Sequence, residues 1–543
     1  MSAVTPPPPR LAGANWANRT LFHGDNLPVL RGMNSGSVDL IATDPPFNKG
    51  RDFHATPESL ASGAKFQDRW RWDDDVEGDW IDQLQDDWPN VWHVISAARS
   101  SWGDDLGAFL CFMAVRLLEM HRILKAEGSL YLHCDPTASH YLKQLLDAIF
   151  GKSQFRNEIV WRRTGSHNSS NRFGPIHDVL LFYARSDAYR HRPVFTPYLK
   201  GHVDTFFKKR DEIGRYWTNS IHGSGTRNGA SGQPWRGFDP TAEGRHWAVP
   251  GDLVTAFGID PDLPQHDKLD ALFELGLIDL PSGGGLPTYR QYLHTSPGQI
   301  LQDVWAFQPH TNGVLHQDDA GIDEDVRWIP PRDKKERTGY PTQKPLGLLE
   351  RIIKSSSDPD DIVVDPFCGC ATTPVAAERL GRQWVGIDIW DGAYDQVLQR
   401  LQKEGLTAPD SSRDDNRMFV FGNVTYRQEP PARTDGGETA APFLQVTERV
   451  DEPPGPRWTR AEMYEHLLTQ HGPVCQGCDR TFDDKRYLQL DHNTPRADGG
   501  INHISNRVLL CGPCNQLKSN IYTLSGLRRQ NRKLGYMAKT PPT

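Results

Sequence analysis

The sequence predicts an α/β protein with a doubly wound, mostly parallel sheet and a second, much smaller C-terminal domain. Two observations predict the sheet. Strand-like apolar runs alternate with helix-like segments, and one run, DIVVDPFCGCATT, passes through a glycine turn and a helix into a strand that ends in an acid, WVGIDI. A third observation predicts the small domain: two CxxC pairs near the C-terminus, Cys475 with Cys478 and Cys511 with Cys514, have the spacing of a tetrahedral zinc site.

Length and composition limit the class of protein. At 543 residues the chain is too long for one compact core, and we expect about two to four domains. No window approaches about eighteen uninterrupted apolar residues, so no membrane span is expected. Residues 1–18 begin MSAVTPPPPRLAG, which lacks the apolar core of a secretory signal, so we expect a disordered start and a cytoplasmic protein.

Charge is distributed unevenly along the chain, whose net charge is −8. Acidic side chains crowd residues 73–87, whereas residues 511–543 contain no acid. The basic side chains of that tail are Lys518, Arg528, Arg529, Arg532, Lys533 and Lys539. Contact with DNA depends on a basic face rather than on the total charge, so the negative total does not exclude a nucleic-acid partner.

The first strand-turn unit lies in residues 19–186, which we expect to form the first half of the sheet. The apolar run SVDLIAT predicts a buried strand, and the turn Asp44-Pro45-Pro46-Phe47-Asn48 must leave the sheet because proline lacks a ladder donor. Loops at the carboxyl ends of strands in an open α/β sheet bind ligands, so this turn is a candidate site. The alternative is a proline-rich turn capped by aspartate.

The residues of this turn suit a planar group with an exocyclic amine. Asp44 and the Pro45 carbonyl can accept the two amine protons, and Phe47 offers a face for stacking. The text HGDNLPVLRGMNSGSVDLIATDPPFN resembles the amino-methylating DNA methyltransferases, whose D-P-P-Y or D-P-P-F turn holds adenine in this way. The resemblance implies catalytic roles for Asp44, Pro45, Pro46 and Phe47, and it favours adenine because the cytosine 4-amino enzymes more often begin the turn with serine.

The next segments continue the alternation of strand and helix. Residues 51–107 predict a long loop that closes over substrate, with a surface insertion of no function as the alternative. Residues 108–123 predict a helix, SLYLHCDP a strand, and ASHYLKQLLDAIFG a helix that ends at Gly151. Two further strand-like runs, FRNEIVWRR and HDVLLFYARS, follow.

The alternation breaks down in residues 187–330, which are rich in Gly, Pro, Trp and polar residues. In the resembling family the target-recognition region lies here, so we expect an insertion that recognises DNA; an irregular insertion without DNA contact is the alternative. Four arginines are candidates for phosphates or guanine edges, and their spacing does not choose among them. They are Arg210, Arg215, Arg227 and Arg236.

A second constellation lies in residues 331–395, the expected cofactor-binding half. Gly369 lets the backbone approach a ligand, and Asp388 ends the second strand where it can accept hydrogen bonds from ribose hydroxyls. The loop is not G-x-G-x-x-G, which speaks against a dinucleotide. It resembles the D-P-F-x-G-x-G-T-T loop of the same methyltransferases, which bind S-adenosylmethionine, and YPTQKP matches their additional cofactor motif.

The resemblance therefore implies a Rossmann-like S-adenosylmethionine-dependent methyltransferase sheet over roughly residues 19–395. In this sequence the catalytic turn precedes the cofactor loop, and this order is that of the permuted beta class of the family. Cys370 and Ala371 depart from the family, which commonly has Gly and then Thr or Gly there. The implied cofactor-binding residues are Asp25, Lys344, Pro345, Asp365, Pro366, Phe367, Gly369, Thr372 and Asp388.

Residues 396–460 are rich in Pro, Gly and acid and predict a linker to the last domain, residues 461–543. Four thiolates at the observed spacings can surround a structural zinc ion, which in so small a domain supplies much of the folding energy. The alternative is four buried, unpaired thiols.

The text LQLDHNTPRADGGINHISNRVLLCGPCNQLKSN resembles the HNH nucleases and their ββα-metal fold. The resemblance implies His492 as general base, Asp491 and Asn515 as ligands of a divalent metal such as Mg²⁺, and Asn506 as a brace of the loop. Asn515 stands where the family also uses His, and an amide oxygen still binds magnesium. The alternative is a zinc-stabilised DNA-binding module that no longer cleaves.

These observations predict an S-adenosylmethionine-dependent adenine DNA methyltransferase with a C-terminal HNH domain. Double-stranded DNA is the expected partner, with association with the nucleoid through DNA, and the sequence allows a homodimer. Three alternatives stay open: cytosine 4-amino methylation, a DNA-binding regulator in which both sites are degenerate, and a restriction-modification enzyme in one chain.

Overall fold

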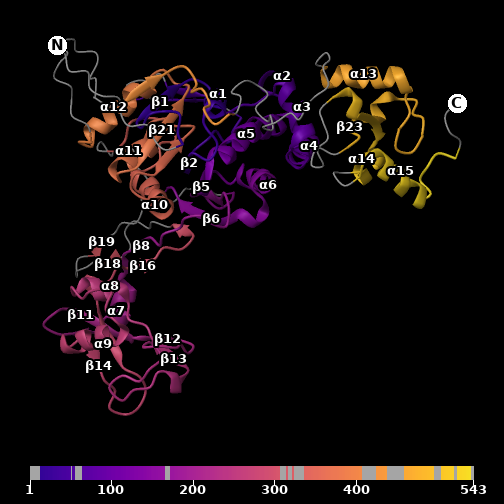
Figure 1. Cartoon of the computed structure of the whole chain (residues 1–543). Helices are drawn as coiled ribbons and strands as arrows, with labels where there is room; N and C mark the ends of the chain where they lie inside the picture. Colours follow the sequence, from indigo (N-terminus) through magenta and orange to yellow (C-terminus); the bar gives the residue numbers. More distant parts are fainter. Residues whose placement is uncertain are drawn as a thin grey trace, which may run out of the picture.

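The computed structural model of the chain is shown in Figure 1. It describes residues 13–50, 52–55, 61, 64–164, 171–305, 314–315, 321–322, 336–406, 424–436, 458–494, 503–518 and 522–539. Within these ranges, no helix is long and apolar enough to cross a membrane.

The main sheet has nine strands in the described part of the chain. Their order is β17 (Val304–Trp305), β6 (Phe155–Arg162), β7 (His177–Ala184), β5 (Leu124–Cys134), β2 (Val38–Thr43), β20 (Ile362–Asp365), β21 (Gln383–Asp388), β1 (Thr20–His23) and β22 (Thr425–Arg427). Only β7 runs against its neighbours, β5 and β6, and all other pairs are parallel. Strands β20 and β21 insert between β2 and β1, so the two halves of the sequence form one sheet, as predicted.

Helices cover both faces of this sheet, which confirms the doubly wound α/β class. The helices packed on one face are α1 (Asn26–Gly32), α4 (Pro89–Trp102), α5 (Asp104–Ile123) and α6 (Ser139–Phe150). The helices on the other are α10 (Leu346–Ser356), α11 (Thr372–Arg379) and α12 (Ala393–Lys403). Successive residues of β2 alternate between the two cores: Ile41 packs in the first, and Leu40 and Ala42 pack in the second.

Most of the segment expected to be a long loop, residues 51–107, folds into secondary structure instead. It contains the hairpin β3 (Phe53–His54) with β4 (Lys65–Phe66) and the helices α2 (Trp72–Asp75), α3 (Gly78–Asp87) and α4. Its aromatic residues explain the difference, because Trp72 and Trp80 are buried in the first core. Aromatic content in this segment therefore indicated packing rather than an open loop.

The insertion after β7 folds around a core of its own that includes Trp235, Trp247 and Tyr292. Its four-stranded sheet is β10 (Lys209–Arg210), β11 (Arg215–Ser220), β15 (Thr288–Tyr292) and β14 (Ile278–Asp279). Its helices are α7 (Lys200–Phe206), α8 (Gly251–Ala256) and α9 (Gln265–Glu274). The short strands are β12 (His222–Ser224), β13 (Arg245–Trp247), β8 (Phe195–Thr196), β16 (Gln299–Ile300), β9 (Tyr198–Leu199), β18 (Val314–Leu315) and β19 (Gly321–Ile322).

The structure corrects two expected segments. Residues 13–18, expected to be disordered, are folded: Trp16 is buried and the Asn15 amide donates to the Gly32 carbonyl at 2.7 Å. The expected linker begins inside α12 and contains β22, which hydrogen-bonds to β1. Apolar residues explain both corrections: Trp16 packs in the first core, and Val397 of α12 and Val424 before β22 pack in the second. Residues 1–12, 407–423 and 437–457 lie outside the described residues.

The C-terminal module, which we define as the described residues from 458 onward, has the predicted ββα order. Strands β23 (Leu488–His492) and β24 (Arg507–Cys511) pair antiparallel and lead into α14 (Gly512–Lys518). Helices α13 (Arg460–His471) and α15 (Leu524–Lys533) flank them. In Figure 1 the module lies beside α3 and α4, away from the insertion that carries β11 and α9.

Candidate active site and metal centre

A cleft of about 1130 Å³ opens at the carboxyl ends of β2, β20 and β21. Its walls include the Asp44 turn, the Gly369 loop and residues of α3. The carboxyl ends of parallel strands meet at one edge of a sheet, so two motifs more than 300 residues apart in the sequence become neighbours. The Thr43 hydroxyl, for example, donates to the Asp365 carboxylate at 2.8 Å.

The Asp44 carboxylate is held by two basic side chains. His133 Nδ1 lies 2.6 Å from Asp44 Oδ1, and the Lys344 ammonium donates to Oδ2. Burial alone would raise the pKa of Asp44, but the charges of Lys344 and His133 and the hydrogen bonds from both outweigh it and lower the pKa to about 2. Asp44 is therefore ionised at neutral pH and fixed in orientation.

The other ring nitrogen of His133 faces a second acid. His133 Nε2 lies 3.3 Å from Asp178 Oδ2, and Arg163 Nε lies 2.8 Å from Asp178 Oδ1. The His133 side chain is only 4% exposed. Basic and acidic side chains thus alternate in the order Lys344, Asp44, His133, Asp178 and Arg163, so each of the two carboxylates lies between two basic side chains.

The turn around Phe47 is fixed by an acid from a distant loop. The Asp68 carboxylate, which is buried, accepts hydrogen bonds from the backbone N–H groups of Asn48 and Lys49. Asn48 has a φ of +61°, in the left-handed region that asparagine tolerates. The Phe47 ring lines the cleft next to Lys49 Nζ, which lies 5.1 Å from its centroid. The orientation of this aromatic face is therefore set before any ligand arrives.

The second wall of the cleft is the loop between β20 and α11. Gly369 has a φ of +50°, and a Cβ there would lie 3.1 Å from the Tyr340 ring, so a larger residue would be strained in this conformation and would require the ring to shift. Its N–H donates to Asp388 Oδ2 at 2.6 Å, while Asp388 Oδ1 accepts from the Trp390 N–H at 2.8 Å. Burial raises the pKa of Asp388. The acid at the end of β21 therefore shapes the loop and also borders the cleft.

The remaining predicted cofactor residues surround the same loop. Asp25 caps α1, and its two carboxylate oxygens accept from Nη2 of the buried Arg116 guanidinium at 2.9 and 3.0 Å. The Asn26 amide donates to the Pro366 carbonyl at 2.7 Å, which ties α1 to the loop. The Thr372 hydroxyl donates to the Lys344 carbonyl at 3.2 Å. Phe367 lines the cleft, and Pro345 is the N-cap residue of α10.

The two departures from the family pattern are accommodated differently. Cys370 is buried, and its carbonyl accepts from Arg400 at 2.8 Å. Ala371 has a φ of +66°, which costs about 1 kcal/mol for a residue with a Cβ. The loop keeps its shape at this cost because α11 begins directly after it.

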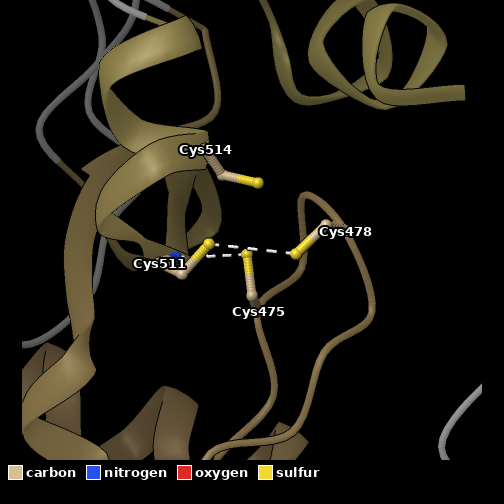
Figure 2. Close-up of side chains that lie close together, drawn as sticks. All are labelled: Cys475, Cys478, Cys511 and Cys514. Carbon is tan, nitrogen blue, oxygen red and sulfur yellow. Dashed lines mark hydrogen bonds between the residues drawn. The ribbon is translucent and has the colours of Figure 1, made fainter. Parts of the chain in front are cut away.

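The C-terminal module contains a cluster of four cysteines, the only group of three or more potential metal-ligating Cys, His, Asp or Glu side chains among the described residues. Figure 2 shows the four sulfurs converging from the Cys475–Cys478 turn and from the start of α14. All four lie within 4.8 Å of one another, and the sulfurs of Cys478 and Cys511 are 3.8 Å apart. A tetrahedral site with Zn–S bonds of about 2.3 Å requires sulfurs about 3.8 Å apart, so the four side chains fit one zinc ion.

The predicted HNH residues do not converge in the same way. Asp491 Oδ2 lies 2.9 Å from Lys518 Nζ, a buried ammonium, and the Asn515 amide donates to Gln489 at 2.7 Å. His492 is buried and points from the other face of β23, with its Nδ1 3.4 Å from Arg507. The Lys518 ammonium neutralises Asp491 and occupies the position that a metal ion would need, so this arrangement of the side chains does not fit a magnesium ion.

Asn506 contacts the loop that it is predicted to brace. Its side-chain amide donates to the Thr494 carbonyl at 3.1 Å, and its side-chain oxygen accepts from the Thr494 N–H at 2.8 Å. Asn506 is itself buried. It therefore fixes the chain directly after His492.

A family model described as DNA methylase matches residues 38–399, about two thirds of the chain. The chain belongs to this DNA methylase family. A second model, described as HNH endonuclease, matches residues 475–520, which contain the cysteine cluster and β23 to α14. The methylase domain and the HNH domain are thus joined in one chain.

Known methylases are similar over parts of the chain. It is 33% identical over 300 residues to the type II methyltransferase M.EcaI of Enterobacter cloacae, covering 54% of this chain and 57% of that protein. It is 27% identical over 372 residues to the Mod subunit of the type III restriction-modification enzyme StyLTI of Salmonella typhimurium, covering 66% and 50%. It is 22% identical over 384 residues to the DNA adenine methyltransferase YhdJ of Escherichia coli, covering 70% and 82%. The chain spans little more than half the length of the first two.

Sequence reasoning missed His133, Asp178 and Asp68 of this methylase. His133 follows an apolar strand in the run LHCDP, so the rule that strand ends line the site was available to find it. Asp178 begins the antiparallel strand β7, and Asp68 lies in the misjudged loop, so the sequence held no comparable signal for either. Sequence reasoning also assigned Lys344 to the cofactor, whereas its ammonium contacts Asp44.

Arg236 and Arg215, two of the candidate arginines of the insertion, lie next to acidic side chains. Arg236 Nη2 lies 2.8 Å from Asp270, and its guanidinium stacks on Phe273 at 4.3 Å. Arg215 lies 3.6 Å from Asp204. Arg210 and Arg227 are exposed. DNA contact by any of them stays a prediction.

Replacing Asp365 with Asn is expected to stabilise the methylase at alkaline pH. Burial, with a smaller effect of the Asp44 charge, raises the pKa of Asp365 to about 6. The folded protein then binds the proton more tightly than the unfolded chain, so stability falls as pH rises from about 4 to 6. Asn cannot ionise, and the gain is about 3 kcal/mol above pH 6. Urea unfolding at about pH 4 and pH 8 tests this; an equal difference between the two proteins at both pH values would contradict it.

Proposed function

We propose that the chain transfers a methyl group from S-adenosylmethionine to the 6-amino group of adenine in DNA. The observation that carries the proposal is one cleft lined by an ionised Asp44 at the end of β2 and by the Gly369 loop at the end of β20. Its volume of about 1130 Å³ accommodates both a cofactor and an extruded base. The similarity to YhdJ, a DNA adenine methyltransferase, supports adenine over cytosine.

The residues of the chain fit S-adenosylmethionine on two counts. Gly369 carries no Cβ, which allows a ligand to approach its backbone in the cleft, and the Asp388 carboxylate borders the cleft where ribose hydroxyls would lie. Asp25, Phe367 and Thr372 are proposed to contact the remaining parts of the cofactor. When bound, the cofactor supplies an electrophilic methyl group on a sulfonium.

The proposed role of the turn is to orient the adenine amine. Asp44 accepts one amine proton and the Pro45 carbonyl accepts the other, so the nitrogen lone pair is held toward the methyl group. Phe47 supports the ring of the extruded base. Positive charge develops on the nitrogen as the new bond forms, and the nearby Asp44 anion stabilises it. With a pKa of about 2, Asp44 is too weak a base to keep the amine proton, which passes on to solvent.

A direct test incubates the purified chain with unmethylated DNA and labelled S-adenosylmethionine, followed by digestion to nucleosides and mass analysis. N6-methyladenosine is the expected product. N4-methylcytosine would replace the adenine assignment, and the absence of any methylated nucleoside would favour a DNA-binding regulator. The same reaction with and without magnesium, scored for strand breaks, tests the HNH domain separately.

His133 is proposed to position Asp44 rather than to contact the base. Replacing His133 with Leu is expected to reduce the rate of transfer by roughly tenfold or more, because Asp44 loses a charge-assisted hydrogen bond. Replacing it with Asn, whose amide can donate near the Nδ1 position, is expected to restore most of the rate. Initial rates at saturating cofactor measure both variants. Equal rates for His133→Asn and His133→Leu would contradict a positioning role.

Residues 187–330 are proposed to recognise the target sequence. The HNH domain is proposed to hold the DNA that flanks the target sequence. Binding of magnesium by Asp491 and Asn515, with His492 as base, requires Lys518 to leave Asp491.

We also propose that the chain is bound to the nucleoid through DNA and forms a homodimer there. Light scattering of the free protein and of its DNA complex measures the oligomeric state.

A further inference from the structure

Two arginines of the C-terminal module converge on one carboxylate of the methylase domain. Arg460 Nη1 donates to Asp86 Oδ1 at 2.7 Å, and Arg507 Nη1 donates to the same oxygen at 3.0 Å. Arg507 Nη2 donates to the second oxygen, Oδ2. Asp86 is on α3, nearly 400 residues before Arg460 in the chain. Figure 1 shows α3 beside the module.

The contact is buried although all its members carry charge. The side chains of Asp86 and Arg507 are 8% and 1% exposed. Burial raises the pKa of Asp86, but the charge and hydrogen bond of Arg507 outweigh it and lower the pKa, so the carboxylate is ionised. Removing one partner of such a pair leaves a buried charge uncompensated. The two arginines therefore require an anion at this position.

The geometry is that of a phosphate site. Arginine binds carboxylates and phosphates with the same fork of donors, and the two Asp86 oxygens stand in for two non-bridging oxygens of a phosphodiester. Arg507 Nη1 also lies 3.4 Å from His492 Nδ1, so the site borders the residue that the HNH resemblance marks as its base. Arg460 donates in addition to the Leu490 carbonyl at 2.7 Å, which fixes it to β23.

The two contacting surfaces have opposite charge. Residues 458–543 contain twelve Lys and Arg against seven Asp and Glu, whereas the whole chain has a net charge of −8. Helix α3, GDWIDQLQDD, contains four Asp and no basic residue. The same helix reaches the cleft, where Trp80 forms part of the wall. An acidic helix thus covers the arginine pair of a basic module and connects it to the methylase cleft.

We propose that Arg460 and Arg507 form a binding site for a DNA phosphate and that Asp86 occupies this site in the free protein. The proposal rests on the proposed function of the module in holding DNA. Docking of the module on α3 and binding of DNA by the arginine pair exclude each other. A segment of duplex that reaches the pair displaces Asp86 and releases the module from α3.

The test measures binding of a fluorescent duplex by the full-length, zinc-loaded chain without magnesium. Asp86→Asn removes the competing anion and is expected to increase the affinity by about tenfold and to steepen its salt dependence by about one to two counterions. Asp82→Asn, one turn earlier on α3, removes the same charge from the same helix while Asp86 stays in place, and serves as the matched control. Adding Arg460→Gln to Asp86→Asn is expected to return the affinity to the wild-type value.

Small-angle scattering tests displacement directly, because release of the module enlarges the radius of gyration. Asp86→Asn with duplex is expected to give the extended form. Unchanged affinity and dimensions in Asp86→Asn, with zinc and methyl transfer retained, would overturn this inference and leave the proposed function standing. Equal gains in Asp86→Asn and Asp82→Asn would overturn it as well, and inorganic phosphate that releases the module as effectively as duplex would overturn the assignment to DNA. If the wild-type chain transfers no methyl group to DNA, that result would instead count against the proposed function.

Discussion

Replacing Asp44 with Asn is expected to reduce methyl transfer by roughly a hundredfold to a thousandfold, the range found when a preorganised polar group is removed from a reacting centre. The amide keeps the size of the carboxylate but not its charge. The developing charge on the adenine amine then has no anion beside it, and the Lys344 ammonium and His133 lose their common partner. Single-turnover rates with labelled cofactor measure this loss.

Cofactor binding separates this effect from unfolding. The Gly369 loop and Asp388 contact each other and not Asp44, so equilibrium dialysis is expected to show nearly unchanged affinity for S-adenosylmethionine in Asp44→Asn. Asp147→Asn is the matched control, because Asp147 lies on α6, outside the cleft, where it pairs with Lys143 of the same helix and accepts from Tyr183 of β7. A normal rate of transfer by Asp44→Asn would show that the turn does not hold the base.

The sequence was sufficient to predict the edge of the sheet at which the site lies. An apolar strand that meets two prolines must end, and the carboxyl ends of parallel strands share one edge, so Asp44 and Gly369 were expected together. The structure brings them to one cleft. It also joins the two halves of the sequence in one sheet, as predicted, with β20 between β2 and β21.

Contacts between distant segments were not predictable in this way. Asp68 and Asp86 lie in a segment whose Asp and Trp content suggested an open loop, yet one fixes the Phe47 turn and the other meets Arg507. The groups that these two acids contact depend on how the segment packs against the rest of the protein. The local sequence pattern carries no information about this packing. Strand β22 was missed for the same reason, because its three residues, Thr425–Arg427, are too few to show a period.

The HNH residues show that a motif fixes neighbours in sequence but not their partners in space. Asp491 and His492 are adjacent, and in a strand adjacent side chains point to opposite faces. Asp491 therefore meets Lys518 on α14, whereas His492 meets Arg507 and the surface next to α3. The metal-binding expectation treated these two residues as one site, and the pleat of β23 separates them.

Removing zinc is expected to unfold the C-terminal module while the methylase sheet stays folded. Cys475→Ser removes one of four ligands, and structural zinc sites of this kind contribute an apparent binding free energy of about 10–16 kcal/mol to folding. The module's own apolar core is small, with about a dozen buried residues, four of them the cysteines themselves. The variant is expected to lose its zinc, to expose residues 458–539 to trypsin, and to keep methyl transfer.

Metal analysis of the purified chain gives the first measurement, with one zinc per wild-type chain expected. Cys111→Ala is the matched control, because Cys111 is a buried thiol of α5 within the first core and not part of the cluster. It is expected to keep its zinc and its protected module. Because Asp86 contacts Arg460 and Arg507 only when the module is folded, Cys475→Ser also removes the anion's partners and leaves α3 uncovered. A zinc-free wild-type chain whose module still resists trypsin would show that the four thiols pack without a metal.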